Sequence, residues 1–494
     1  MRRLFCFKLT IFPLVKLIGN GHFMKIILKA ITVLLLLAFP IYAQSDIAGT
    51  WGGEIKMLTM QLEFQLKIVK SKNSFAGFMS IPSQKLNEYQ LQVFTFKKNK
   101  IHFELPSQAG TAKFDGDLKA DSIKGKILQA GIEGSFYLTK NKKTGATVQT
   151  EIKKSELLSY SEEEVAFKSG RILLAGTLTY PKSGNKFPTV ILLTGNGPQN
   201  RDEDILGFKI FERIADYLSS HGFAVLRYDD RGVGGSTGNT MRSTTADFAD
   251  DAKAAIDFLK KQSNIDSKKI SLLGHSEGAS IAALAADNNK DVACLIFMSA
   301  PGLPGGEILL EQQRLILKAG KVSDEIIGQN LELQKKINDV LLKNKDFETL
   351  RKDIETFAQK DFETLSPEIK NSIKDKNAYI NSTVQSQIAM FDNPWFHYYI
   401  QYDPSLILSK INQPVLLTFG GLDLQVPVNQ NKPVIEEALK RGGNNKIKSV
   451  VFHKANHLYQ EAVTGSPAEY QSIKKEFVDG FLKDISDWLE QNLK

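Results

Sequence analysis

The feature that most constrains the fold is a strand, a tight turn and a helix in direct succession over residues 270–286. An apolar run at 270–273 is followed by Gly-His-Ser-Glu-Gly at 274–278 and then by small apolar residues. Glycine two residues before and two residues after Ser276 lets the chain reverse sharply and holds the hydroxyl clear of a sheet. The first N–H groups of the helix then point toward any negative charge that forms there. The segment predicts a nucleophile at Ser276; a purely structural turn is the alternative.

Strand and helix patterns alternate on both sides of this segment. Strands are expected at 165–167, 173–180, 189–194, 224–228, 270–273, 415–419 and 447–452, and helices at 208–219, 247–260, 280–286 and from about 466 to 493. The helix expected at 247–260 carries one apolar stripe with helical spacing. Such alternation predicts a mostly parallel sheet that is covered by helices on both faces.

Residues 303–390 interrupt this alternation, because they are charged and helical in pattern and contain no strand signal. Helices are expected to begin at Ser323-Asp324-Glu325 and at Ser366-Pro367-Glu368, the second with proline at its first position. The segment is predicted to be a helical cap inserted between two sheet strands. The α/β core would then comprise residues 160–302 and 391–494.

A separate all-β domain is predicted over residues 45–145. Apolar residues alternate there with polar ones, as at 62–68 and 101–105, and turn signals separate the runs. A period of two places one face of each strand in a core, so we expect a small β-barrel or β-meander. Aromatic residues beside its turns allow contact with a glycan or an envelope partner. Packing inside the domain is the favoured interpretation.

Residues 1–43 have the pattern of a signal segment. Two lysines follow Met24, a short apolar run ends at Pro40, and Ala43 is a small residue at a cleavage position. The run is shorter than the roughly 20 residues that span a bilayer, so a cleaved signal is favoured over a membrane anchor. Met24 is the predicted start, and the predicted location is the periplasm or the exterior.

The charge of the chain argues against nucleic acid as a partner. The net charge of +8 comes from 63 basic and 55 acidic residues, but six of the basic residues and none of the acidic ones lie in 1–43. The remaining 57 basic residues almost balance the 55 acidic ones, so no basic footprint is indicated. Outside the leader the only cysteine is Cys294, which lies in an apolar run and is predicted to be a core residue.

From about residue 165 onward the chain resembles the α/β-hydrolase superfamily, and most of all its bacterial esterase and serine-aminopeptidase-like branch. The matching segments are LLTGNGPQNRD (192–202), YDDRGVGGSTG (228–238), GHSEG (274–278), GGLDLQVP (420–427) and ANHLYQ (455–460). They occur in the family's order and extend over about two thirds of the chain. The resemblance implies a serine nucleophile, an acid and a histidine base, in that order along the chain.

A serine hydroxyl needs a base, and the base needs an acid that orients it. His457 follows the last predicted strand, where the family places its base, whereas His453 still lies at the strand end. Asp423 lies on the glycine-flanked loop after 415–419 and matches the family's acid. Asp403, which precedes a proline, is the alternative and fits a turn residue.

Two backbone N–H groups must stabilise an oxyanion. One is expected from Glu277, directly after the nucleophile, and the other, by resemblance, from Asn196. The family usually has His-Gly where this chain has Thr194-Gly195, so the chain departs from the pattern at this loop. Residues 229–232 are expected either to brace the loop or to form an ion-paired turn.

The predicted function is an exported serine hydrolase that cleaves a carboxylic ester through an acyl-enzyme. The alternatives are a serine peptidase or aminopeptidase, a thioesterase, and a binding module that lacks catalysis. The expected partner is a small ester or a short peptide. No cofactor or metal is expected, because the sequence contains no HExxH, no paired CxxC and no Walker loop.

Overall fold

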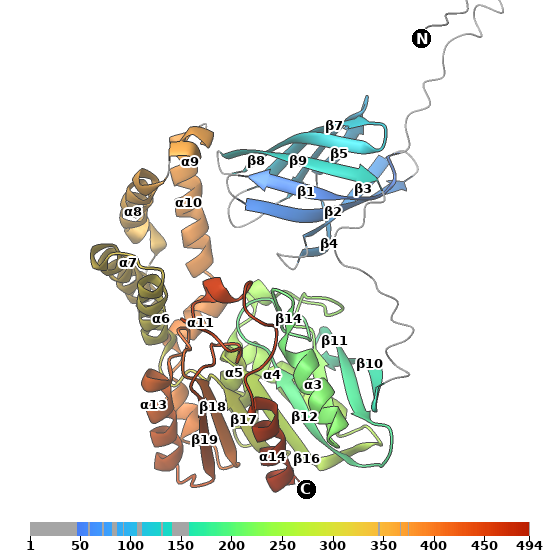
Figure 1. The fold of residues 1–494 in the computed structure, drawn as a ribbon, viewed down its shortest axis with the longest axis vertical. Coiled ribbons are helices and arrows are strands. Elements are labelled where there is room, and N and C mark those ends of the chain that lie inside the picture. The colour runs from blue at the N-terminus through green and yellow to red at the C-terminus, as the bar shows by residue number, and fades with distance from the viewer. Residues whose placement is uncertain are drawn as a thin grey trace, which may run out of the picture. The chain divides into compact units, whose positions relative to one another are not determined.

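The computed structural model describes residues 47–493 except for 58–59, 72–73, 82–85, 92, 106–110, 130–131, 141–157, 344–345, 366 and 374. The predicted leader, 1–43, lies outside the described residues. Two sheets dominate the described part, one entirely antiparallel and one mostly parallel (Figure 1). Among the described helices, none is long and apolar enough to cross a membrane.

The N-terminal domain is an antiparallel meander of nine strands, as its alternating sequence predicted. They are β1 (Gly49–Met57), β2 (Met60–Ser71), β3 (Ser74–Ile81), β4 (Leu86–Gln90), β5 (Val93–Lys97), β6 (Lys100–Leu105), β7 (Ala112–Lys119), β8 (Ser122–Gln129) and β9 (Ile132–Lys140). The sheet order is β4-β3-β2-β1-β9-β8-β7-β6-β5. The sheet curls so that β3 and β5, which lie near opposite ends of this order, approach each other. A Cβ on Gly77 of β3 would lie only 2.4 Å from the Phe94 ring of β5.

Phenylalanine rings fill the inside of this curled sheet. Phe103 and Phe114 stack with their centroids 4.5 Å apart, and Phe136 meets Phe114 edge-on at 5.5 Å. Phe64 joins the same cluster, and all four rings are buried. These aromatic residues therefore pack the domain itself, while a glycan or envelope contact through it stays a prediction.

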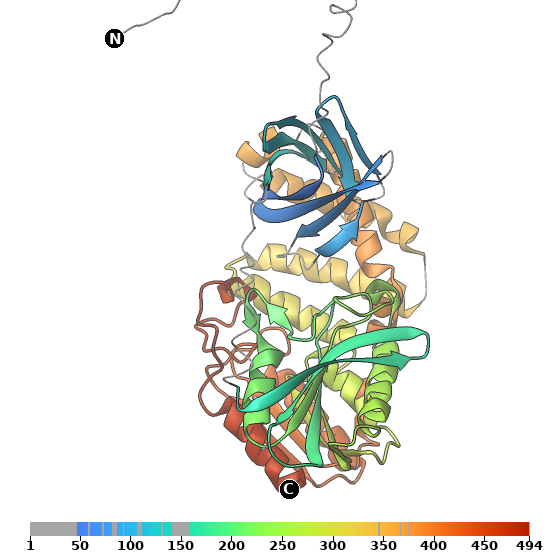
Figure 2. The ribbon, with the colours of Figure 1, turned by 90° about the vertical axis from the view of Figure 1, so that its right-hand side faces the viewer.

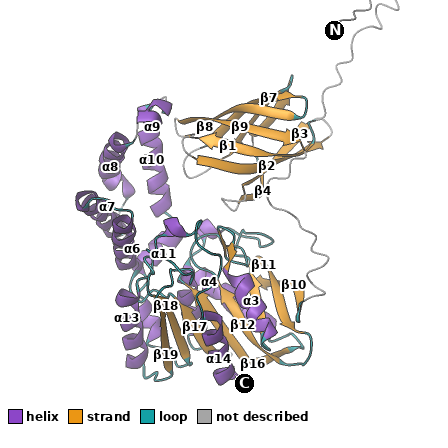
Figure 3. Ribbon diagram, viewed as in Figure 1, coloured by secondary structure: helices purple, strands orange, loops and turns teal. Residues whose placement is uncertain are grey.

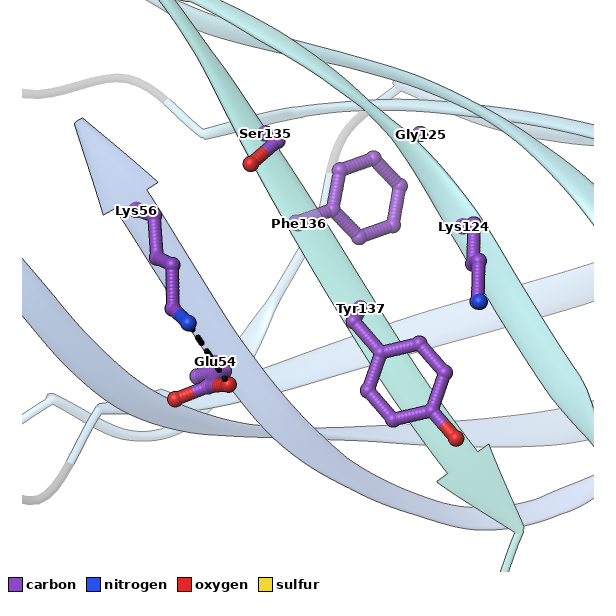
Figure 4. A pocket seen from close by; sticks show the side chains of 7 residues that line it. All are labelled: Glu54, Lys56, Lys124, Gly125, Ser135, Phe136 and Tyr137. Carbon is purple, nitrogen blue, oxygen red and sulfur yellow. Dashed lines mark ion pairs between the residues drawn. The ribbon is translucent and has the colours of Figure 1, made fainter.

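The outer face of the domain carries a shallow hollow on β1, β8 and β9 (Figure 4). Lys56 lies 3.4 Å from Glu54, and the Lys124 ammonium lies 5.3 Å from the centroid of the Tyr137 ring. These cations already have partners on the same sheet. The hollow contains no pairing of nucleophile and base.

The second sheet is eight-stranded, with the order β10-β11-β15-β12-β16-β17-β18-β19. Its strands are β10 (Tyr160–Ser169), β11 (Ile172–Pro181), β12 (Phe187–Leu193), β15 (Ala224–Tyr228), β16 (Ile265–His275), β17 (Val292–Met298), β18 (Val415–Gly420) and β19 (Ile447–Phe452). The first three strands are antiparallel neighbours and the rest are parallel. The mostly parallel sheet predicted from the sequence is confirmed, and it is the strand order and strand directions of an α/β-hydrolase fold.

Helices cover both faces of this sheet, as Figures 2 and 3 show. One apolar cluster joins the sheet to α4 (Thr245–Leu259), α5 (Glu277–Ala286) and α13 (Val428–Arg441). The other joins its opposite face to α3 (Ile210–Ser220) and α14 (Phe481–Leu493). Because the parallel strands point the same way, the loops after β12, β16, β18 and β19 meet at one edge.

The helical insertion extends beyond the predicted boundary at residue 390. Its helices are α6 (Gly305–Ala319), α7 (Asp324–Leu342), α8 (Arg351–Thr364), α9 (Pro367–Ser372), α10 (Lys376–Phe391) and α11 (Pro394–Gln401). Phe396 and Ile400 of α11 share a buried cluster with α7, α8 and α10. The helical insertion therefore ends before the short helix α12 (Pro404–Leu408), whose N-terminus is capped by Asp403. Two helix starts, Ser323 before α7 and Pro367 in α9, agree with the sequence.

The predicted C-terminal helix from about 466 to 493 is wrong over its first half. The structure has only a short 3₁₀ turn at Pro467–Glu469, and α14 begins at Phe481. Gly480 adopts φ +83°, and the N–H of Val478 donates to the carbonyl of Tyr459. The loop is thus held by contacts with a distant segment, which overrides the local helical preference.

Cys294 lies on β17 with no exposed surface, and its sulfur is 3.1 Å from the Ser271 hydroxyl. Burial raises the pKa of its thiol to about 11. The prediction that it is a core residue is confirmed.

Removing a ring from the N-terminal cluster should loosen that domain selectively. We expect Phe114→Ala to lower the local opening free energy of β6, β7 and β9 by about 3–5 kcal/mol, because a buried ring leaves a cavity. Amide hydrogen exchange of these strands measures the change. Val69→Ala, at a side chain that is 44% exposed, is the control and should cost less than about 1 kcal/mol. Equal exchange in both variants would contradict the assignment of this core.

Candidate active site

Ser276 occupies the sharp turn between β16 and α5, with φ +54° and ψ −121°. This left-handed backbone conformation is uncommon for any residue other than glycine. A Cβ on Gly274 would lie 2.0 Å from the carbonyl oxygen of Gly278. A Cβ on Gly278 would lie 2.1 Å from the carbonyl oxygen of Leu193 at the end of β12. Both glycines are therefore required sterically, and the turn holds Ser276 half-buried at the edge of the sheet.

His457 and Asp423 form a buried pair on two neighbouring loops. Nδ1 of His457 lies 2.7 Å from Oδ2 of Asp423. The other carboxylate oxygen of Asp423 accepts from the backbone N–H groups of Gln425 and Val426 at 2.8 and 2.9 Å. Burial alone opposes the ionised acid, but the nearby His457 and these donors outweigh it and hold the pKa of Asp423 below its ordinary value.

The alternative base and acid lie in different settings. His453 follows β19 directly and is exposed. Asp403 caps α12, and its carboxylate accepts from the N–H of Ser405 at 2.9 Å. Asp403 is a turn residue, which was the favoured interpretation of it.

The loops that carry Ser276 and His457 are joined beside the serine. His275 precedes Ser276, and its Nε2 lies 3.0 Å from the carbonyl oxygen of His457. The two imidazole centroids are 4.8 Å apart. The structure thus brings the serine turn, His457 and Asp423 to the same edge of the sheet.

The loop after β12 lies beside Ser276. A Cβ on Gly195 would lie 3.4 Å from the Cβ of Ser276. The N–H of Gly195 donates to Oε1 of Glu203 at 2.8 Å, so it is already engaged. Asn196 is the next residue on the loop and is exposed. The N–H of Glu277 belongs to the first turn of α5, where N–H groups lack intrahelical partners.

Residues 229–232 brace this loop and also form ion pairs, so both expectations for them hold. Asp230 accepts from the hydroxyl of Thr194 and from the N–H of Gln199, each at 2.8 Å. Asp229 pairs with Arg201, while Arg231 pairs with Asp251 on α4. At Thr194, where the chain departs from the family pattern, the hydroxyl ties the loop to Asp230.

The side chain of Glu277 connects the site to the helical insertion. Its Oε1 accepts from the hydroxyl of Thr245 at 2.6 Å and from the indole N–H of Trp395 on α11 at 2.7 Å. Burial raises the pKa of this carboxyl. The Trp395 ring stacks on Tyr399 with centroids 4.8 Å apart. The backbone of Glu277 therefore directly follows Ser276, while its side chain binds α11.

Two residues of the site were missed from the sequence. Glu203 contacts the turn from 72 positions away in the chain, and Trp395 contacts Glu277 from 118 positions away. The only available signal was that a histidine inside the buried turn, His275, needs polar partners. Within the described residues, no cluster of three or more histidine, cysteine, aspartate or glutamate side chains could hold a metal ion.

Alanine at position 278 should displace the serine turn. The added methyl would overlap the Leu193 carbonyl, so we expect Gly278→Ala to lose about 100-fold or more of its rate of labelling by a fluorophosphonate. Gly328→Ala, in the interior of α7, is the control, because a Cβ there meets nothing within 4 Å. It should label normally and gain about 0.5–1 kcal/mol of helix stability. Normal labelling of Gly278→Ala would contradict the steric account.

Comparisons with known proteins find similarity to hydrolases. The family model described as "Serine aminopeptidase, S33" matches residues 208–360. Esterase EstD of Thermotoga maritima is 27% identical over 333 residues, which cover 67% of this chain and 68% of that protein. An uncharacterised 31.7 kDa protein of Escherichia coli is 22% identical over 65% of this chain and 96% of its own length.

Solved structures with a similar arrangement include an esterase of Pyrococcus furiosus and an acylaminoacyl peptidase of Pyrococcus horikoshii. The first is 17% identical, with 68% of this chain and 92% of that one covered and a TM-score of 0.41. The second is 14% identical, with 88% and 62% covered and a TM-score of 0.43. The sheet has the strand order of the α/β-hydrolase fold, and the sequence is similar to the serine aminopeptidase family model over residues 208–360 and to an esterase, so the chain is a hydrolase enzyme with this fold.

Proposed function

We propose that this hydrolase cleaves a carboxylic ester through an acyl-enzyme on Ser276, with His457 as base and Asp423 as the orienting acid. One observation carries the proposal: the Nδ1–Oδ2 hydrogen bond of 2.7 Å between His457 and Asp423, on a loop joined to the serine turn by the His275 contact. A base, an orienting acid and a serine on a strained turn are the parts that this chemistry requires.

The reaction runs in two steps. Since Nδ1 of His457 donates to Asp423, Nε2 is the nitrogen that takes the proton of the serine hydroxyl as Oγ attacks the carbonyl carbon. The N–H groups of Glu277 and Asn196 would stabilise the oxyanion. His457 then protonates the leaving alcohol and later activates a water molecule, which releases the acid and restores the serine.

The ionised state of Asp423 supports this role, because a carboxylate stabilises the imidazolium that forms during each step. Its pKa lies below the ordinary value, so it stays ionised where an unfolded aspartate, with a pKa of about 3.9, would begin to protonate. The ionised Asp423 carboxylate therefore adds to the free energy of unfolding above the pKa of an unfolded aspartate. This contribution is lost as pH falls through the lower pKa of Asp423 in the folded protein.

The esterase relative favours an ester over the alternatives. The serine aminopeptidase family model supports an aminoacyl amide or short peptide as the second candidate, and a thioester would use the same groups. The anchoring of α11 at Glu277 favours a cap over the serine, which suits a small or medium substrate.

Substitution of the three proposed residues should abolish turnover. We expect Ser276→Ala, His457→Ala and Asp423→Asn each to lower kcat on short-chain aryl esters by a factor on the order of 10⁴ to 10⁶. The matched controls are Ser280→Ala one turn along α5, His453→Ala and Asp403→Asn, which should keep kcat. Hydrolysis of aryl esters, acetylated sugars and aminoacyl amides by the wild type ranks the substrate classes.

Two outcomes would overturn the assignment. Equal rates for Ser276→Ala and the wild type would exclude Ser276 as the nucleophile. If the wild type does not label with a fluorophosphonate and binds an ester without hydrolysing it, the protein is a binding module on a hydrolase scaffold.

The proposal includes export to the periplasm or the exterior, supported by the basic and apolar pattern of residues 1–43. Mass spectrometry of the protein from its native envelope or medium should find a mature N-terminus near Gln44. An intact N-terminus at Met24 in the cytosol would contradict export.

A further inference from the structure

A second buried acid–imidazole pair lies beside the proposed catalytic one. The side chain of Glu203 is buried. One of its two carboxyl oxygens, Oε1, makes both contacts: it lies 2.8 Å from the backbone nitrogen of Gly195 and 2.9 Å from Nδ1 of His275. The proposed chemistry does not use either Glu203 or His275. Their contacts nevertheless involve the loops that carry every proposed catalytic group except Asp423.

The pair connects three loops in one chain of contacts. Glu203 holds Gly195, directly before the proposed oxyanion donor Asn196. His275 is fixed in the serine turn next to Ser276, and its Nε2 reaches the carbonyl oxygen of His457 at 3.0 Å. Movement at any one of these contacts would displace the nucleophile, the base and the oxyanion loop relative to one another.

The hydrogen-bond acceptors around His275 determine how many protons its ring carries. The His457 carbonyl can only accept, so Nε2 of His275 must carry a proton. Oε1 of Glu203 accepts from the N–H of Gly195, and as a carboxylate oxygen it accepts from Nδ1 too, so Nδ1 must carry a proton as well. His275 is then an imidazolium paired with a carboxylate, and the buried pair has no net charge.

The charges around His275 are consistent with the protonated ring. Burial opposes the charge, but the Glu203 carboxylate, the His457 carbonyl and Asp423 outweigh it and raise the pKa of His275. The other titratable groups that face the ring are His457, 4.8 Å away between centroids, and Tyr459 at 6.5 Å.

The conformation and burial of Glu203 lower the stability of the folded protein. Its backbone has φ +46°, in the left-handed region, and its Oε2 is buried without a hydrogen-bond partner in the described structure. An unpaired buried carboxylate oxygen and a strained backbone both lower stability. Such a residue is therefore poorly explained by stability alone.

We propose that Glu203 and the doubly protonated His275 are positioning residues that align the serine turn, the oxyanion loop and the base loop for the reaction. This inference rests on the proposed function of Ser276 and His457. The pair touches no substrate; it acts through Gly195, Ser276 and the backbone of His457.

Glu203→Gln tests the proton requirement, because one oxygen serves both donors. The glutamine must point its oxygen at that position to keep the Gly195 contact, and the His275 ring must then donate from Nδ1. A neutral ring with its proton on Nδ1 has none left on Nε2 for the His457 carbonyl. Without the carboxylate, His275 loses its second proton at a lower pH, so the link to His457 breaks as pH rises.

We expect kcat of Glu203→Gln on an aryl ester to fall by about 10- to 100-fold at neutral to alkaline pH, while KM changes by less than about threefold. The ratio of wild-type to variant kcat should increase as pH rises. Glu436→Gln on α13, a partly buried glutamate that bonds Ser449, is the matched control and should leave kcat unchanged at each pH. A ratio for Glu203→Gln that does not vary with pH would indicate a merely structural role and overturn the proposal.

A measurement on the unaltered protein keeps the test valid if Glu203→Gln does not fold. In ¹⁵N-histidine-labelled protein, with His275 assigned through His275→Asn, both ring nitrogens of His275 should be protonated at pH values above the ordinary imidazole pKa of about 6.5. A singly protonated ring would overturn the inference. Failure of the proposed function is distinct, because it would appear as unchanged turnover in Ser276→Ala, whatever Glu203→Gln does.

Discussion

The site depends on one steric constraint, the left-handed backbone at Ser276, which exists only because residues 274 and 278 have no side chains. The close approach of Gly278 to the Leu193 carbonyl fixes the distance between the serine turn and the end of β12. The parallel order of the sheet then brings the loops after β18 and β19 to the same edge. Asp423 and His457 lie on these neighbouring loops, and Nδ1 of His457 is 2.7 Å from Oδ2 of Asp423.

Local sequence patterns predicted most of this fold because its central strands are buried on both faces and its helices carry clear apolar stripes. The serine turn was predictable because Gly274 and Gly278 lie only two residues from Ser276 in the sequence. The stretch 466–480 was not predictable, because it is held by contacts such as the Val478–Tyr459 hydrogen bond rather than by its own helical preference. The boundary at 390 failed similarly, since Phe396 belongs to the insertion only through packing.

The partners that complete the site were beyond sequence reasoning, because each contact joins segments distant in the chain. Glu203 appeared to be one acid in a polar loop, yet it holds Gly195 and His275 together. Trp395 appeared to be one aromatic residue in a helical segment, yet it donates to the carboxyl group of Glu277, the residue directly after Ser276. A shift of α11 would therefore displace the residue next to Ser276.

The buried thiol on β17 has a consequence for how this protein tolerates its surroundings. Cys294 is the only cysteine among the described residues, it has no exposed surface, and its raised pKa keeps it a thiol rather than a reactive thiolate. The described part of the chain therefore has no internal disulfide to gain or lose. The packing of the described residues around Cys294 should therefore be the same under reducing and oxidising conditions.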